Sequence, residues 1–146
     1  MKNPWQVVPI GTVQGSRSQP EDDDWDRESA EIVLDPAVVG PEATLGLEDF
    51  SHVEVIYLFH RVAPDAVVTD ARHPRGNRAW PRVGILAQRG KARPNRIGVT
   101  ICRLVEVDGA RLVLEGLDAI DGTPVLDVKP VMRAFLPRGP HREPEW

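Results

Sequence analysis

The sequence predicts an all-β fold: a small, single-domain β-barrel, closed or nearly closed, with a few short helical turns. Several short apolar or alternating segments are punctuated by Gly and Pro, which is typical of such folds, and helical periodicity is scarce. The chain has 146 residues, of which 41% are hydrophobic and 27% charged, so we expect one globular domain. We place the barrel at residues 1–136 and a Pro-rich tail at 137–146.

Four segments in the first part of the chain are expected to be ordered. Trp5–Val13 is apolar and β-branched, although Pro9 interrupts it, and Ala30–Leu34 is a short strand. Gly40–Ser51 is expected to hold one or two helical turns. Val53–Phe59 is almost wholly apolar, as is typical of a strand buried on both faces.

The second part of the chain contains a predicted hairpin. Gly98–Val107 and Arg111–Leu117 are apolar or alternating, and the Asp-Gly pair between them is a hairpin-turn signal. Val83–Ala87 before the hairpin and Val125–Val128 after it are expected to be further short strands.

Two segments are not well-formed strands. Gly15–Glu28 is polar and acidic. We interpret it either as a mobile loop or, because Trp25 is an odd residue for a linker, as a segment that folds over something. Whether its acidic run Asp22–Asp26 closes over a ligand is left open. Pro137–Trp146 contains three prolines and is expected to run extended along the surface or across a subunit boundary.

Positive charge is concentrated in one segment. Residues 71–105 contain nine Lys or Arg residues and no Asp or Glu, whereas the whole chain has a net charge of −4. Both signs intermix on a merely solvated surface, so we expect this segment to meet an anionic partner, which arginine suits well. The nine cations are Arg72, Arg75, Arg78, Arg82, Arg89, Lys91, Arg93, Arg96 and Arg103.

Three loops are candidates for chemistry. Arg72–Arg78 has the cations and pliable backbone that suit a phosphate chain, or else it pairs with the acidic Glu21–Asp26 run. Gln88–Gly98 is either a binding loop presented by the barrel or an exposed hairpin loop. In Leu117–Pro124, Asp121 could accept hydrogen bonds or a proton, or face a cation, although an Asp-Gly turn alone is common.

Several classes of protein are disfavoured. No apolar run approaches the roughly 20 residues of a membrane span, and the first residues lack the order typical of a signal peptide. The single cysteine, Cys102, allows no intrachain disulfide and no zinc site of paired thiolates, and we interpret it as a buried small hydrophobe. We expect a cytoplasmic protein without a metal or a membrane partner. The residues alone lead to a barrel with one basic, loop-built site for an anionic or nucleotide-like ligand.

Four separate motifs resemble the TsaA-like (YaeB/TrmO) family of S-adenosylmethionine-dependent tRNA methyltransferases in order and spacing, over about residues 8–135. The chain is identified as a divergent short member. The motifs are Pro9–Gly11, Phe50–Val53 with Tyr57–His60, Val83–Arg89 with Arg93–Asn95 and Ile97–Gly98, and Leu117–Pro130.

The resemblance implies a β-barrel that binds S-adenosylmethionine, forms a homodimer and methylates the N6 nitrogen of threonylcarbamoyl-adenosine in tRNA. Backbone groups of the turns would hold the adenine edge, Arg89 would pair with the methionine carboxylate, and Asp121 or a nearby carbonyl would face the sulfonium. Nine cofactor-binding residues are expected: His60, Arg61, Arg89, Arg93, Pro94, Asn95, Asp121, Gly122 and Thr123.

The basic segment fits the function that the resemblance implies, whereas the catalytic group is left open. Substrate contacts to an anionic RNA arm are expected from Arg72, Arg75 and Arg78. No general base is evident, and the candidates for a catalytic role are Asp118, Asp121 and Asn95.

The chain departs from the family pattern in the Gln88–Gly98 loop, near the start of the chain, and after Lys129-Pro130, where Val131 replaces a Tyr. The family's common Ser-Pro is Gly90-Lys91 here, and Arg96 replaces a second Pro. The family's Pro-Arg-Gln segment is replaced by residues 21–25. Three functions are therefore considered: a tRNA methyltransferase, a methyltransferase for a small molecule or another RNA, and a non-catalytic S-adenosylmethionine-binding module.

Overall fold

The computed structural model describes residues 4–19, 23, 25 and 28–146. The chain divides into two compact units. We call Met1–Leu58 with Val99–Val131 the barrel unit, and Phe59–Gly98 with Met132–Trp146 the ribbon unit. The described residues contain no α-helix. None of their helical turns is long and apolar enough to cross a membrane.

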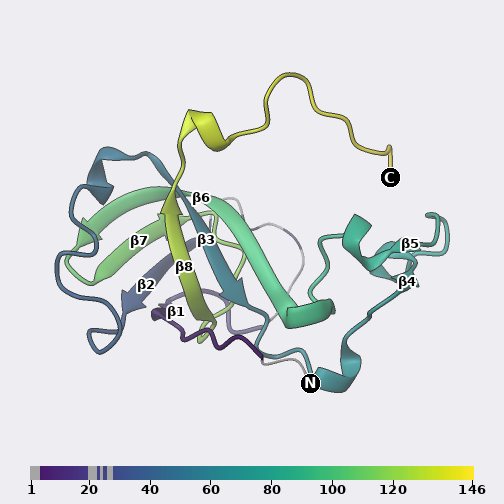
Figure 1. Cartoon of the computed structure of the whole chain (residues 1–146), viewed down its shortest axis with the longest axis horizontal. Coiled ribbons are helices and arrows are strands. Elements are labelled where there is room, and N and C mark those ends of the chain that lie inside the picture. Colours follow the sequence, from purple (N-terminus) through teal and green to yellow (C-terminus); the bar gives the residue numbers. More distant parts are fainter. Residues whose placement is uncertain (1–3, 20–22, 24, 26–27) are drawn as a thin grey trace. The chain divides into compact units, whose positions relative to one another are not determined.

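Six strands of the barrel unit close into a barrel in the order β1-β2-β7-β6-β3-β8, and β8 pairs back onto β1 (Figure 1). The pairs β1–β2, β1–β8, β2–β7, β3–β8 and β6–β7 are antiparallel. The predicted all-β barrel is therefore confirmed. The strands are β1 (Gly11–Gln14), β2 (Ser29–Leu34), β3 (His52–Leu58), β6 (Ile97–Asp108), β7 (Arg111–Glu115) and β8 (Pro124–Pro130).

Alternation along the strands builds the barrel core. Every second residue of β2, β3 and β7 is buried while its neighbours are partly or fully exposed, as expected where one face of a sheet lines a single interior. Cys102 on β6 is buried, so its interpretation as a small core hydrophobe is confirmed. Fully buried side chains of the barrel include Val13, Ile32, Val53, Val55, Leu112, Leu114 and Val125.

Two strand predictions require correction. The expected strand Trp5–Val13 begins only at Gly11, and Trp5 is 96% exposed. Pro9 has no N–H for a strand ladder, which fits this late start. The stretch Val53–Phe59 is not fully buried on both faces, because the second face of β3 is only partly covered.

The predicted hairpin is confirmed, with Asp108 paired to Arg111 across the turn. Helical turns occur as predicted within residues 40–51, where η1 (Leu47–Asp49) is a 3₁₀ turn. The expected strand Val83–Ala87 is only partly correct, because its second half is the 3₁₀ turn η4 (Ile85–Ala87).

The ribbon unit has little regular structure of its own. Its two-stranded ribbon pairs β4 (Ala71–Arg72) with β5 (Val83–Gly84). The ring of Trp146 lies 6.3 Å from the ring of Trp80, measured between centroids. The remaining 3₁₀ turns are η2 (Pro64–Ala66), η3 (Pro74–Gly76), η5 (Pro94–Arg96) and η6 (Arg133–Phe135).

Candidate functional site

The turn Asp118–Thr123 of the barrel unit is held by a side chain from the barrel interior. The buried Tyr57 hydroxyl donates to the Asp118 carbonyl at 2.6 Å. Since that hydroxyl has one proton, Thr100 must be the donor in the 2.8 Å contact between the two hydroxyls. The buried Thr123 hydroxyl donates to the Ile120 carbonyl at 2.7 Å. A barrel side chain and an internal bond therefore fix both ends of the turn.

The residues after β1 hold the same turn from another side. The Gly15 N–H donates to Oδ1 of Asp121 at 3.0 Å, and the Asp121 N–H donates to the Arg17 carbonyl at 2.6 Å. The Ser16 hydroxyl donates to the Ala119 carbonyl at 2.7 Å. One oxygen of the Asp121 carboxylate thus has a structural partner, as the hydrogen-bonding interpretation of Asp121 requires.

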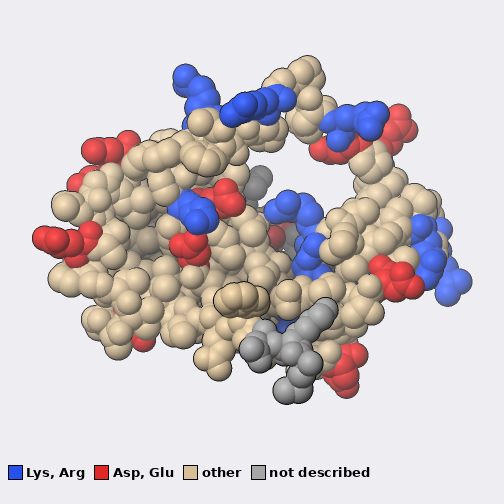
Figure 2. Space-filling view, viewed as in Figure 1, with Lys and Arg blue, Asp and Glu red and all other residues tan. Residues whose placement is uncertain are grey.

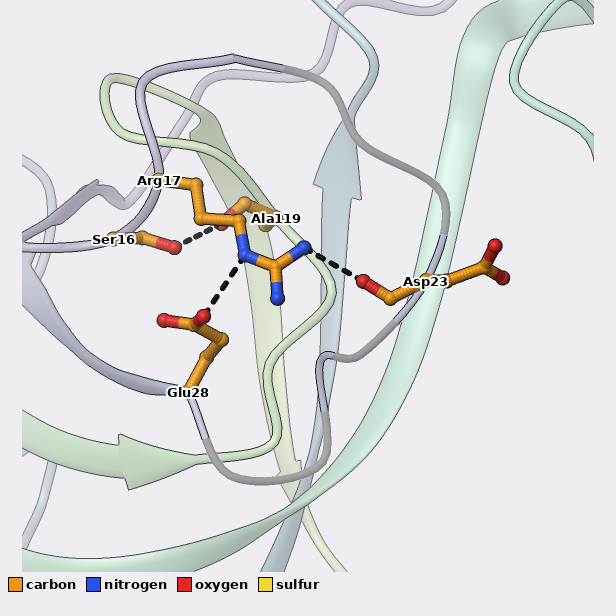
Figure 3. Close-up of polar contacts among 5 residues, drawn as sticks. All are labelled: Ser16, Arg17, Asp23, Glu28 and Ala119. Atoms are coloured by element: carbon orange, nitrogen blue, oxygen red, sulfur yellow. Dashed lines mark hydrogen bonds and ion pairs between the residues drawn. The ribbon is translucent and has the colours of Figure 1, made fainter.

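Arg17 is a residue that the sequence reasoning missed. Its Nε donates to Glu28 Oε1 at 2.9 Å and its Nη1 to the Asp23 carbonyl at 2.6 Å (Figure 3). Its guanidinium carbon lies 4.3 Å from the centroid of the Trp25 ring, which is a cation–π distance. The available signal was Trp25 itself, an aromatic residue within an acidic run.

The interpretation of residues 15–28 as a segment that folds over something applies in part. Trp25 is buried, with 7% of its surface exposed. Much of the acidic Asp22–Asp26 run, including Asp22, Asp24 and Asp26, lies outside the described residues. The open question of closure over a ligand therefore stays open.

In the ribbon unit, Gln88 joins the ribbon to the basic loop. Its Nε2 donates to the carbonyls of Arg72 at 3.2 Å and Val83 at 3.0 Å. Its own carbonyl accepts a 2.5 Å bond from Arg93 Nη1. Gln88 has 8% of its surface exposed, and a buried amide needs such partners. In the sequence Gln88 is only the first residue of the candidate loop Gln88–Gly98, and an isolated Gln gives no signal of this role.

The Arg-Pro-Asn piece leads from the extended Arg93 into the turn η5, in which Asn95 has a φ of 63° and Arg96 a φ of 50°. Asn tolerates this left-handed region better than most residues. The Phe59 N–H donates to the Arg96 carbonyl at 2.8 Å, and Arg96 Nη1 donates to the Val62 carbonyl at 2.6 Å. The ribbon unit therefore brings the strand end that carries His60 and Arg61 beside this turn.

The remaining predicted binding residues also lie in the ribbon unit. Arg89, Pro94 and Asn95 are exposed, while His60 is partly buried. Nine of the predicted binding residues, including all three substrate arginines, belong to this unit, whereas Asp118, Asp121, Gly122 and Thr123 belong to the barrel unit.

The three substrate arginines differ in their surroundings. The Nε of Arg72 lies 3.4 Å from Gln88 Oε1, and a Cβ added to Gly90 would lie 2.6 Å from Arg72 Nη2. Arg72 thus packs within its own unit. Arg75 and Arg78 are exposed. Figure 2 shows the Lys and Arg residues of one face in blue. Among the described residues, no group of three or more His, Cys, Asp or Glu residues could hold a metal ion.

A family model described as the tRNA-methyltransferase O N-terminal domain matches residues 12–135. A probable S-adenosyl-L-methionine-binding protein of Pyrococcus abyssi is 35% identical over 131 residues, which are 87% of this chain and 68% of that protein. The tRNA (adenine(37)-N6)-methyltransferase of mouse is 44% identical over 96 residues, covering 65% of this chain and 22% of the relative. The Escherichia coli protein of that name is 41% identical, covering 62% and 40%.

Solved structures agree with these matches. A crystal structure of TrmO from Pseudomonas aeruginosa superposes with a TM-score of 0.74 at 29% identity, over 95% of this chain and 61% of that one. A second TrmO crystal structure gives 0.76 at 31% identity, over 97% and 64%. Measured by the matched residues, the chain spans about a fifth of the mouse methyltransferase and two fifths of the E. coli one.

Proposed function

Because this chain belongs to the family of the tRNA-methyltransferase O N-terminal domain, we propose that it is an S-adenosylmethionine-dependent methyltransferase. Its proposed acceptor is the N6 nitrogen of threonylcarbamoyl-adenosine in tRNA. The observation that supports this most directly is the 41–44% identity to relatives named tRNA (adenine(37)-N6)-methyltransferase in a bacterium and a mammal. Two archaeal relatives, from Pyrococcus abyssi and Methanothermobacter thermautotrophicus, are named as probable S-adenosyl-L-methionine-binding proteins, which supports the choice of cofactor.

The donor groups of the chain fit the cofactor chemically. S-adenosylmethionine has a carboxylate, which suits an arginine fork, and an adenine edge, which suits backbone groups of a turn. Arg89 and the Arg93–Asn95 turn offer the first kind of group, and Asp121–Thr123 offers the second. The nine residues expected from the family resemblance remain our proposed cofactor residues, with Asp121 contributing its backbone groups and not its carboxylate.

The chemistry that this cofactor supplies when bound is an electrophilic methyl group on a sulfonium. The protein has to align the acceptor nitrogen with that methyl group, so positioning is expected to dominate catalysis. The hydrogen bonds that fix the Asp118–Thr123 turn suit such a task, because a rigid turn presents its groups in one arrangement. Of the three candidates for a catalytic role, Asp118 and Asn95 remain proposed, whereas one carboxylate oxygen of Asp121 already accepts the Gly15 N–H.

The charges of the two units support an anionic acceptor. The ribbon unit contains twelve Lys or Arg residues and four Asp or Glu, whereas the barrel unit contains six and eighteen. A concentration of positive charge in one unit favours polyanion binding. We therefore place the proposed RNA-binding residues in the ribbon unit, with Arg75 and Arg78 as the exposed members.

Calorimetric titration with S-adenosylmethionine tests the cofactor proposal. We expect one equivalent per chain, and we expect Arg89→Ala to weaken binding by about 1.5–3 kcal/mol, the worth of a hydrogen bond to a charged group. Arg103→Ala, which removes an exposed arginine of the barrel unit, serves as the matched control. Absence of binding to the wild-type protein at millimolar cofactor would contradict the proposal.

Binding of tRNA at several salt concentrations tests the acceptor proposal. Arg78→Ala should weaken binding and reduce the slope of log K against log salt by about 0.7–0.9 for each phosphate that is no longer neutralised. Arg111→Ala, which removes an exposed arginine of the barrel unit outside residues 71–105, should leave the slope unchanged. Arg72 is a poor choice for this test because its removal also takes away the side-chain contact with Gln88 inside the ribbon unit. Equal slopes for wild type and Arg78→Ala would exclude Arg78 from the RNA-binding surface.

A second candidate function is a module that binds S-adenosylmethionine without transferring its methyl group. The archaeal relatives that share most of their length with this chain are named only as probable S-adenosyl-L-methionine-binding proteins, and no general base is evident. Incubation with cofactor labelled in its methyl group and bulk tRNA separates the two functions. Label in the tRNA would exclude the second candidate.

We also propose that the protein is a cytoplasmic homodimer. The support for the dimer is the family resemblance, and sedimentation at micromolar concentration tests it. A monomer under those conditions would overturn this part of the proposal.

A further inference from the structure

We propose that Arg17 and the Asp121 carboxylate are positioning residues that fasten the Gly15–Arg17 segment to the Asp118–Thr123 turn. In this arrangement the carboxylate of Asp121 serves the protein backbone and does not recognise the charge of a ligand. The inference rests on the proposed function to the extent that this turn contacts S-adenosylmethionine.

Hydrogen bonds pair two segments that lie about a hundred residues apart in sequence. The Gly15 N–H donates to Asp121 Oδ1 at 3.0 Å, and the Asp121 N–H donates to the Arg17 carbonyl at 2.6 Å. Between these bonds the Ser16 hydroxyl donates to the Ala119 carbonyl at 2.7 Å. Three consecutive residues after β1 are therefore bonded to the turn, so the position of one segment determines that of the other.

A second feature is the end of β1. Gly15 has a φ of 72°, a left-handed conformation that favours glycine. The chain leaves the barrel at this residue, so the Gly15 N–H needs a partner outside the strand ladder. Asp121 Oδ1 supplies that partner, which accounts for an acceptor oxygen at this position without reference to a ligand.

A third feature is the anchoring of Arg17. Its guanidinium lies over the ring of the buried Trp25. It also donates to Glu28 and to the Asp23 carbonyl (Figure 3). The Arg17 side chain is only 17% exposed. A planar fork that stacks on an aromatic ring and donates in two directions has no equivalent in lysine. Because the Arg17 carbonyl holds the Asp121 N–H, fixing the Arg17 side chain also fixes the turn.

Substitution separates two roles of Asp121, which are holding the backbone in place and recognising the charge of a ligand. Asp121→Asn keeps an acceptor oxygen at the same place but removes the negative charge. Asp121→Ala removes both. A positioning role predicts that the Asn variant behaves like wild type, whereas a charge-recognition role predicts that both variants lose affinity for a cationic ligand.

The test compares S-adenosylmethionine with S-adenosylhomocysteine, which lacks the methyl group and the sulfonium charge, by calorimetric titration. We expect Asp121→Asn to bind both ligands within about twofold of wild type. We expect Asp121→Ala and Arg17→Ala to weaken both ligands equally, by about tenfold, the effect of losing one hydrogen bond that holds the turn. Loss of S-adenosylmethionine affinity alone in Asp121→Asn would overturn the proposal, because the carboxylate would then be recognising charge.

Amide hydrogen exchange of the ligand-free variants gives a second readout that needs no ligand. The Gly15 amide should lose protection in Asp121→Ala and keep it in Asp121→Asn, while Arg17→Ala should deprotect the Asp121 amide. Arg103→Ala is the control for a folded barrel. Unchanged protection of Gly15 in Asp121→Ala would overturn the positioning role. Failure of the wild-type protein to bind either ligand would instead overturn the proposed function, and the exchange experiment would still decide the positioning role.

Discussion

Cys102 lies on β6 with 3% of its surface exposed, and burial raises the pKa of its thiol from 9.0 to about 12. The neutral thiol is therefore the form present in the folded protein at neutral pH. Between about pH 9 and pH 12 the unfolded chain releases this proton and the folded chain retains it. In this window Cys102 lowers the free energy of unfolding as the pH rises, by about 1.4 kcal/mol per pH unit.

Thiol reactivity checks this assignment. A thiol that is buried and protonated reacts slowly, because the thiolate is the nucleophile. We expect no labelling of Cys102 by a disulfide reagent in the native protein at pH 8 and rapid labelling of one thiol per chain in guanidinium. Rapid labelling of the native protein would show that β6 opens readily or that the thiol is not buried.

Gln88 is a second residue whose importance comes from its partners. Gln88→Leu keeps the size of the side chain but removes the amide donor that serves the Arg72 and Val83 carbonyls. We expect the free energy of unfolding to fall by about 1–3 kcal/mol, the cost of leaving buried polar groups without partners. Chemical denaturation measures this, with the exposed Arg82→Ala as the control. A change below about 0.5 kcal/mol, typical of surface substitutions, would contradict the role of Gln88.

At the scale of the element, the β1–β2 pair depends on a close approach at Gly11. Gly11 pairs with Leu34 across the two strands, and a Cβ added there would lie 2.6 Å from the Val33 carbonyl oxygen. The backbone itself blocks a side chain, so neither strand can accept one without moving.

The matched substitutions Gly11→Ala and Gly40→Ala test this packing. At Gly11 we expect a loss of about 1–3 kcal/mol in the free energy of unfolding, the usual cost of overpacking. A Cβ at Gly40 meets nothing within 4 Å, so Gly40→Ala should be neutral or slightly stabilising, since alanine reduces the entropy of the unfolded chain. Thermal unfolding of both variants gives the comparison, and equal effects would contradict the close approach at Gly11.

At the scale of the whole molecule, the core belongs almost entirely to the barrel unit. Among the described residues, Ile85 and Pro74 are the buried apolar side chains of the ribbon unit, whereas the other buried hydrophobic side chains belong to the barrel unit. Few buried apolar contacts are typical of regions that open at low free energy. The Lys and Arg residues, in contrast to the buried hydrophobic side chains, are concentrated in the ribbon unit.

Limited trypsin digestion tests this division. We expect the first cuts after basic residues within 61–96, at a protease concentration that leaves the barrel strands uncut. Mass spectrometry of the early fragments identifies the sites. First cuts at Arg103 or Arg111, which lie on β6 and β7, would show that the barrel opens as easily as the ribbon unit.

The barrel itself could be predicted from the sequence. Alternation in Arg111–Leu117, the Asp-Gly turn and the short Gly- and Pro-punctuated segments depend on local patterning, and patterning with period two determines which face of a strand is buried. The order of motifs likewise led to the family that the matched residues 12–135 confirm.

Other features were decided only by tertiary structure. The late start of β1, the half-buried second face of β3 and the 3₁₀ turn within Val83–Ala87 depend on what each segment packs against. The roles of Arg17, Gln88 and Tyr57 depend on carbonyl groups that lie far away in the sequence, such as that of Asp118. A single sequence records which donors a chain has, but only the folded backbone determines which acceptors they reach, and this is why the fold could be inferred while these hydrogen bonds could not.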